Sequence, residues 1–175
     1  MYAGLQVRIQ AFALDYLFIA GYLALLIGLG LIFNFLFPDS SRIVFSNPVL
    51  GQFTGFVLIT LPVTLYFSLF ESSAWQATPG KRLRNLKVMD RRNARLSRLR
   101  ALSRTLLKFV PWELAHTCIW QMSTSSREPS LPVIAGLVLV WILVGVILAS
   151  IQTSPKHQAI YDYLAGSYVV TRQKS

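Results

Sequence analysis

"QVRIQAFALDYLFIAGYLALL", residues 6–26, determines how the rest of the chain is interpreted. A helix that crosses a bilayer needs about 20 mostly apolar residues, and this stretch supplies them. Two charged residues interrupt the pattern: Arg8 near its beginning, and Asp15 two helical turns further on. On insertion scales, an aspartate in the middle of a membrane helix costs about 2.5–3.5 kcal/mol. The stretch therefore predicts a membrane helix whose carboxylate needs a partner, a wet cavity or a proton.

The composition also indicates an integral membrane protein of one small domain. Of the 175 residues, 54% are hydrophobic and only 14% are charged, whereas an average soluble domain carries about 25% charged residues. The formal net charge is +10, and ten of the 17 Lys and Arg residues lie between Lys81 and Arg104. Such a block can bind nucleic acid, but beside apolar runs of membrane length it is typical of a cytoplasmic loop. Nucleic acid is therefore not expected as a partner.

Apolar runs of membrane length occur at 9–37, 49–70 and 131–151, and each predicts a transmembrane helix. The first run is too long for the core of a signal peptide, so we expect it to remain as a helix. A fourth segment, 101–122, is also long enough to cross but contains five residues that do not suit a membrane helix: Arg104, Lys108, Pro111, Glu113 and His116. It either crosses or lies flat at the interface as an amphipathic helix.

The distribution of Lys and Arg favours a crossing by 101–122. With that crossing, the N-terminus, the basic loop 71–104 and the C-terminal tail share one side and carry fourteen basic residues. The other two loops carry one each, Arg42 and Arg127. Because basic loops stay in the cytoplasm, we predict an all-α bundle of four transmembrane helices with both termini cytoplasmic. The expected membrane domain covers 6–172, and 173–175 form a short tail.

The loop 71–104 also carries signals of β-structure. "TPGK", residues 78–81, is typical of a turn, and "LKVM", residues 86–89, alternates apolar and polar side chains as a half-exposed strand does. We expect a small cytoplasmic β-hairpin between the second and third helices. "GSYVV", residues 166–170, predicts a C-terminal strand on the same side, where it could pair with the strand of the loop.

Arg8 and Asp15 lie on nearly the same helix face, because seven residues turn a helix through about 700°, and roughly 10 Å apart along the axis. An arginine near a helix end can extend to the headgroups, whereas the shorter aspartate cannot. Asp15 could pair with a basic residue of another helix, for which Arg104 and Lys108 are available. It could also bind an ion or a substrate, since ionisable residues inside membranes are functional candidates by default. Both interpretations stay open.

Glu113 and His116 lie three residues apart and so about 60° apart around a helix. They could share a proton, but we favour a position at the outer interface beside Trp112 and Trp120. One Glu and one His fall short of the ligands that a metal site needs. The single cysteine, Cys118, excludes an intramolecular disulfide. With no catalytic triad order and no glycine loop for phosphate, we expect neither an enzyme nor a cofactor.

Three blocks of the sequence, in order, carry a resemblance to a known family. They are "RIQAFALD" at 8–15, "TPGKRLRNLKV" at 78–88 followed by Arg104, and "YDYLAGSYVV" at 161–170. This arrangement resembles the RDD family of small, mostly prokaryotic membrane proteins, named for one arginine and two aspartates. By position these would be Arg8, Asp15 and Asp162. The chain departs from the family pattern at Tyr161, where relatives often carry His, at Ser167, where they often carry Thr, and in "RRNA" (91–94), which lacks a common Gly.

The resemblance implies a multi-pass protein of a prokaryotic inner membrane, with transport suggested and sodium–proton antiport proposed for some members. In a transporter, Asp15 would bind a cation or proton, Arg8 would tune its affinity and Asp162 would complete a gate. Secondary candidates for the pathway are Arg104, Lys81, Glu113 and His116. The alternative is a non-enzymatic scaffold or partner subunit whose polar cluster is a latch. In both cases the expected partners are the lipid bilayer, anionic headgroups at the basic loop, and a second copy or another membrane protein.

Overall fold

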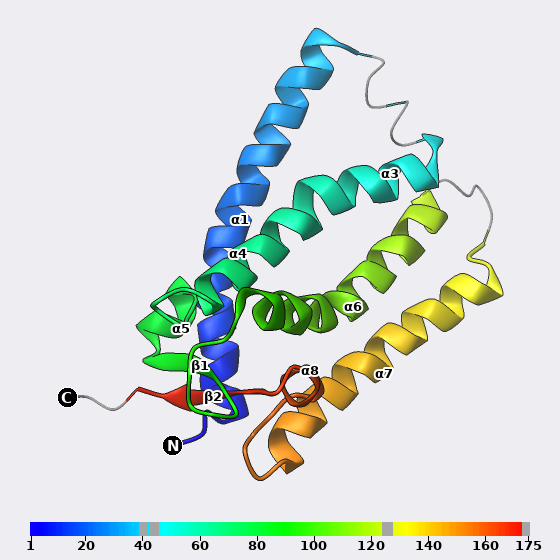
Figure 1. Ribbon diagram of the computed structural model, residues 1–175. Helices are drawn as coiled ribbons and strands as arrows, with labels where there is room; N and C mark the ends of the chain where they lie inside the picture. The colour runs from blue at the N-terminus through cyan, green and yellow to red at the C-terminus, as the bar shows by residue number, and fades with distance from the viewer. Residues whose placement is uncertain (39–41, 43–45, 124–127, 173–175) are drawn as a thin grey trace.

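The computed structural model describes residues 1–38, 42, 46–123 and 128–172, and these are mostly helical (Figure 1). The three longest helices are α1 (Leu5–Leu36), α6 (Arg98–Ser123) and α7 (Leu131–Thr153). Before α6, three helical segments follow one another without a break: α3 (Pro48–Gly55), the π-helical η1 (Phe56–Thr60) and α4 (Leu61–Glu71). The short elements are α5 (Pro79–Leu83), β1 (Leu86–Asp90), α8 (Ile160–Leu164) and β2 (Ser167–Thr171).

Three helical segments are long and apolar enough to cross a membrane: Leu5–Leu36, Pro48–Glu71 and Leu131–Thr153. The prediction of three helices of membrane length is thus confirmed. Their apolar stretches are largely exposed, with 0%, 28% and 6% of the residues buried. In water such surfaces would associate, but in lipid they are solvated. The fourth expected span corresponds to α6, whose charged side chains keep it outside this set of apolar helices.

α6 forms the centre of the helical part, because it packs against α7 on one side and against α3, η1 and α4 on another. The contact with α3 is close at Gly51, where an added Cβ would overlap the Trp120 ring. A small residue at this point lets the two backbones approach, as is common between membrane helices. Pro111 lies inside α6, and Pro62 follows the π-helical turn η1. Proline lacks the N–H that continues a helical ladder, and wider turns commonly accompany it.

A small cap of short elements lies at one end of the helices. β1 pairs with β2 in an antiparallel register from Leu86 opposite Thr171 to Asp90 opposite Ser167. The N-terminus joins the edge of this sheet, because the Ala3 amide donates to the Val169 carbonyl at 2.9 Å. Both chain ends therefore lie at the capped end of the molecule (Figure 1).

The hairpin expected inside the loop 71–104 is not formed in the described residues, where the sheet has two strands and only β1 comes from the loop. The chain turns after β1 because the Asp90 carboxylate accepts hydrogen bonds from the amides of Arg92 and Ala94, at 2.8 and 2.9 Å. It then enters α6 instead of returning as a second strand. The pairing of the loop strand with the C-terminal strand, which the sequence also suggested, is confirmed.

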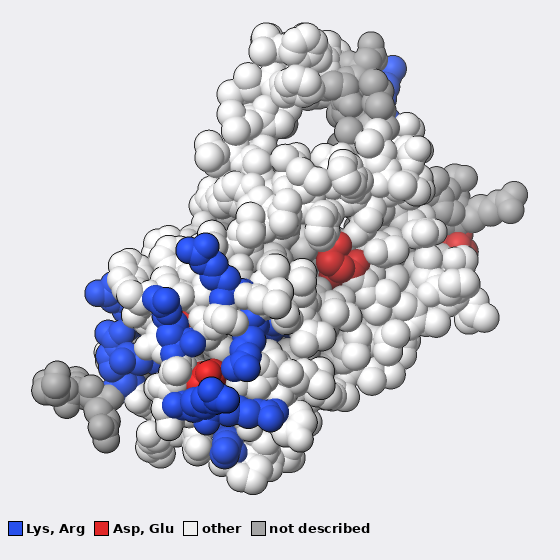
Figure 2. Space-filling view, viewed as in Figure 1, with Lys and Arg blue, Asp and Glu red and all other residues white. Residues whose placement is uncertain are grey.

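The buried apolar core lies in the cap. It joins both strands, the N-terminal residues and the first turns of α1 and α6: Ala3, Ala11, Leu86, Val88, Leu96, Ala101 and Val169. Around this core the surface is basic, and Figure 2 shows the Lys and Arg side chains gathered at the capped end. The structure is therefore polar and charged at one end and apolar along its helices.

Candidate functional site

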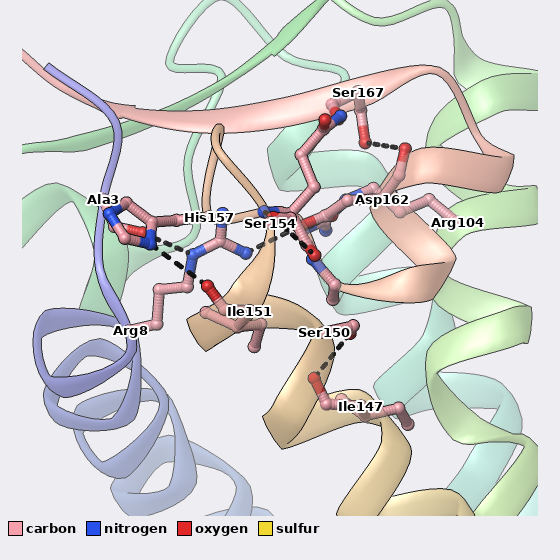
Figure 3. A network of polar contacts seen from close by, with 12 residues as sticks. Ala3, Arg8, Arg104, Ile147, Ser150, Ile151, Ser154, His157, Asp162 and Ser167 are labelled. Atoms are coloured by element: carbon pink, nitrogen blue, oxygen red, sulfur yellow. Dashed lines mark hydrogen bonds and ion pairs between the residues drawn. The ribbon is translucent and has the colours of Figure 1, made fainter.

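The residues that the sequence singled out meet where the cap joins the helices. Arg8, in the first turns of α1, extends toward Asp162 on α8 (Figure 3). Its Nη1 lies 2.6 Å from Asp162 Oδ2, and its Nε donates to the Ala3 carbonyl at 3.0 Å. The side chain of Arg8 is 9% exposed and that of Asp162 is fully buried. An ion pair this well buried links the first helix to the C-terminal segment.

Arg104 of α6 binds two carboxylates at once. Its Nε and Nη2 lie 2.7 and 2.6 Å from Asp162 Oδ1, while its Nη1 donates to Glu71 Oε2 at 2.5 Å. Glu71, the last residue of α4, also accepts from Lys81 of α5. We call these five residues the ionic network: Arg8, Lys81, Glu71, Arg104 and Asp162. It holds α1, α4, α5, α6 and α8 together, and removing one partner from such a buried pair costs about 3–5 kcal/mol.

Asp162 is held in place by its own helix as well as by the arginines. It is the third residue of α8, and its Oδ2 accepts from the Ala159 amide at 3.2 Å. Burial by itself would raise the pKa of this carboxyl, but the facing Arg104 and Arg8 guanidiniums hold the pKa below its ordinary value. Asp162 is therefore an anion at neutral pH. The neighbouring Tyr161, buried and next to this anion, has its pKa raised to about 12 and keeps its proton.

Asp15 lies beside the ionic network but is bound by neutral donors. The Thr78 hydroxyl donates to Oδ2 at 2.5 Å, and the Gly80 amide and the Tyr66 hydroxyl donate to Oδ1 at 2.7 and 2.8 Å. The side chain is fully buried. The cationic partner that we considered for Asp15 is absent among the described residues, since neither Arg104 nor Lys108 forms an ion pair with it. Three hydrogen bonds satisfy the carboxylate instead.

Gly80 explains how the loop can approach α1 so closely. A Cβ at this position would overlap the Ala11 carbonyl oxygen and would come within 2.7 Å of the Asp15 amide nitrogen. The short "TPGK" segment begins α5, with Thr78 as its N-cap and Pro79 in its first turn. The residues that we predicted as a plain turn therefore dock onto the first helix and enclose its carboxylate.

Lys108, one turn after Arg104 on α6, contacts aromatic rings. Its Nζ lies 3.4 Å from the centroid of the Phe67 ring, 4.9 Å from that of Phe12 and 5.1 Å from that of Phe109. These are cation–π contacts. Within the described ranges no carboxylate oxygen lies within 4.0 Å of this ammonium. A cavity of about 400 Å³ between α1, α6 and α7 is lined by Lys108, by the network cations and by apolar side chains.

Glu113 and His116 lie away from the ionic network, on the part of α6 that faces α3 and η1. Glu113 accepts from the Gln52 side-chain amide at 2.8 Å and from the Thr60 hydroxyl. His116 Nδ1 lies 3.6 Å from Glu113 Oε1, and its ring lies 4.7 Å from that of Trp112. Both side chains are mostly buried, with 27% and 16% exposed. Glu113 therefore binds polar groups of the second helical segment, which the sequence did not suggest.

Glu71 is the main site residue that sequence reasoning missed. It stands directly after the uncharged run 49–70, so it was counted with the loop. Its position in the sequence could have indicated its role. Glu71 comes directly after one apolar run and Arg8 directly before another, so both charges are expected at the same membrane boundary. Thr78 and Tyr66, which bind Asp15, were also missed. Tyr66 lies 51 residues from Asp15 in the sequence, so its hydroxyl was brought to the carboxylate by the packing of two helices and not by any local pattern.

A comparison with protein families gives a match. The model described as the RDD family matches residues 2–166, a range that includes Arg8, Asp15 and Asp162 and almost the whole chain. No curated protein and no solved structure matches the chain. The extent of the match shows that this membrane-type chain, with its buried arginine and two aspartates, belongs to the RDD family.

Proposed function

We propose that the chain is a four-span protein of the cytoplasmic membrane of a prokaryote and that it moves an ion or a small solute, with the ionic network as its closed inner gate. The observation that carries this proposal is the burial of the network between apolar helices and the cap. Charges at membrane depth are costly, and they commonly mark pathways for ions or substrates.

The position of the cap supports four crossings. α6 begins and α7 ends at the capped end, where β1 and β2 pair. If α7 crosses the bilayer, α6 has to carry the chain to the far side first. N-terminal residues join the same sheet, so both termini would share one side. The basic side chains of that end favour the cytoplasm.

In the proposed mechanism Asp15 operates the gate through α5. Its carboxylate holds the Thr78 hydroxyl and the Gly80 amide, and the next residue, Lys81, binds Glu71 of the network. A proton or a cation that binds Asp15 weakens its hold on these donors and loosens α5. The ion pair between Lys81 and Glu71 would break next, and the ion pairs of Arg104 with Glu71 and Asp162 would follow. In this scheme the ion acts on Asp15 by competing with three hydrogen bonds.

Flux through proteoliposomes tests the proposal. Purified protein is reconstituted with a pH-sensitive dye inside, and Na⁺ or K⁺ is added outside. Wild-type protein should move protons when the cation is added, and Asp15→Asn should reduce the rate about tenfold or more. Asp90→Asn, a matched change in the cap away from the network, should keep the wild-type rate. A wild-type flux no greater than that of Asp15→Asn would rule out cation–proton exchange through Asp15.

The second candidate function is a membrane scaffold or partner subunit, favoured by the full pairing of the carboxylates in the network. Here the network is a permanent latch, and the basic cap binds anionic lipid headgroups, a second copy or another membrane protein. Each Lys or Arg near a membrane surface contributes about 1 kcal/mol of attraction to anionic lipid. A partner that co-purifies in fixed ratio with wild type but not with Arg91→Gln/Arg95→Gln would support this function. A monomer without a partner would count against it. Enzymatic activity and nucleic-acid binding form no part of either proposal.

A further inference from the structure

The cavity between α1, α6 and α7 combines an apolar wall with a cationic end. Its apolar lining includes Ile9, Trp112, Val144 and Leu148, and its charged lining includes Arg8 and Lys108. Ile9, Trp112 and Leu148 are 52%, 42% and 40% exposed, so the cavity is a groove open to the surroundings of the helices. Those surroundings are lipid in a chain whose helices are of membrane length. At about 400 Å³ the groove is in the size range of small-molecule sites.

Positive charge exceeds negative charge where the groove meets the ionic network. Among the described residues, four cations (Arg8, Lys81, Arg104, Lys108) face three carboxylates (Asp15, Glu71, Asp162), which leaves one cation in excess. Of these four described cations, Lys108 is the one without an ion pair, and Arg8, although paired with Asp162, has one nitrogen left over. In the part of the chain that the structure describes, Lys108 contacts aromatic rings but forms no ion pair or hydrogen bond, and Arg8 Nη2 is buried without a hydrogen-bond partner. A buried donor without a partner is destabilising, so an anion at this point would be stabilised.

The groove is polarised along the helix axes. On α6 its lining extends from Arg104 at the capped end to Ala115, and on α7 from Ile151 at the capped end back to Val140. Eleven residues of helix span about 16 Å. The charged groups lie at the capped end and the remainder is apolar. An occupant with the matching chemistry has an anionic head and an apolar tail that runs parallel to the helices.

We propose that this groove is a binding site for one anionic phospholipid. The phosphate would accept from Lys108 Nζ and Arg8 Nη2, and one acyl chain would lie along Trp112, Val144 and Leu148. A free inorganic anion would satisfy the two donors but would leave the apolar wall uncovered. A second copy of the chain would cover the wall, but the exposed apolar faces of α1 and α7 would give the cations no anion.

This site goes beyond the proposed function and does not depend on transport. α1 and α7 make few contacts with each other, whereas α6 packs along the length of α7. A lipid held in the groove would close the side between α1 and α7 in either a transporter or a scaffold.

Native mass spectrometry of the full-length protein in neutral detergent tests the site. The protein is offered equimolar phosphatidylglycerol and phosphatidylcholine with identical acyl chains. Wild type should retain one phosphatidylglycerol about tenfold more strongly than phosphatidylcholine. Lys108→Met should lose about tenfold in phosphatidylglycerol affinity, as expected for one charge-assisted contact. Lys156→Gln, which removes an exposed lysine outside the groove, should retain the wild-type preference. Equal retention of the two lipids by wild type, or equal effects of the two lysine substitutions, would overturn the proposal.

A second variant keeps the test decisive if Lys108→Met does not fold. Val144→Trp fills the apolar part of the groove while leaving all charges in place, and it should reduce retention of both lipids. Unchanged retention by a folded Val144→Trp would place the lipid elsewhere. Millimolar inorganic phosphate should leave the lipid bound. If phosphate displaces it, or if the protein appears as a lipid-free dimer, the groove takes a free anion or a second copy and the lipid assignment is wrong.

Discussion

Arg8 and Asp162 are 154 residues apart in the sequence, and their side chains meet at 2.6 Å inside the protein. The contact joins the first helix to the C-terminal segment. Arg104 of α6 binds the same Asp162 carboxylate, and another nitrogen of Arg104 binds Glu71 of α4. The contact is therefore also connected to α4 and α6. Arg8 and Asp162 are thus partners in one buried network, while Asp15 anchors the neighbouring α5.

Replacing Asp162 with Asn should destabilise the protein by about 3–5 kcal/mol, because it leaves two buried guanidiniums without their shared anion. Asp90→Asn is the matched control. Its side-chain oxygen can still accept from the Arg92 and Ala94 amides, and it loses only an ion pair with Arg100, whose side chain is 55% exposed. Such a pair contributes about 1 kcal/mol or less. Denaturant unfolding of both variants in the same micelles measures the difference, and equal losses would show that the network contributes no special stability.

The contribution of Asp162 should disappear only in acid. Because the pKa of this carboxyl is lower in the folded protein than in the unfolded chain, its stabilisation is present above the unfolded pKa and is lost as pH falls through the folded pKa. The difference in unfolding free energy between wild type and Asp162→Asn should be flat from about pH 5 to 8 and should shrink below about pH 4. Unfolding curves across this range provide the measurement. A change centred near neutral pH would mean that another group is responsible.

Gly80→Ala should destabilise the contact between α5 and α1 by about 1–3 kcal/mol, because the added methyl overlaps the backbone of α1. Gly145→Ala is the control, since a Cβ at Gly145 in α7 meets nothing within 4 Å. That change should be neutral or slightly stabilising, as Ala favours helix. Thermal unfolding of the two variants gives the comparison. A Gly80→Ala protein as stable as Gly145→Ala would show that α5 does not dock as described.

The four-span arrangement predicts a pattern of thiol labelling. In a Cys118→Ser background, single cysteines are introduced as Arg91→Cys, Glu128→Cys and Lys156→Cys. In intact cells, an impermeant maleimide should label only the cysteine at position 128, and the other two should react after permeabilisation. If α6 instead lies flat on the cytoplasmic side, the cysteine at position 156 should be labelled in intact cells and the one at position 128 only after permeabilisation.

The sequence predicted the parts of the fold that rest on local pattern. Apolar runs gave the three helices of membrane length, and alternation gave the strands that became β1 and β2. It did not give the partners of the charges, because these are set by how distant segments pack. For Asp15 a lysine or arginine partner was one of two open interpretations, but the carboxylate is bound by Thr78, Gly80 and Tyr66. The prediction of a hairpin was wrong because the Asp90 carboxylate accepts hydrogen bonds from the Arg92 and Ala94 amides, and the chain turns there into α6.

A double-mutant cycle on Arg8 and Asp162 tests most directly whether the ionic network holds the helices and the cap together. The unfolding free energies of wild type, Arg8→Gln, Asp162→Asn and the double variant are measured in one detergent. The two groups touch while buried, so each single change should cost several kcal/mol and the double change less than their sum, with a coupling energy of about 1–3 kcal/mol. Costs that add within about 0.5 kcal/mol would contradict the network.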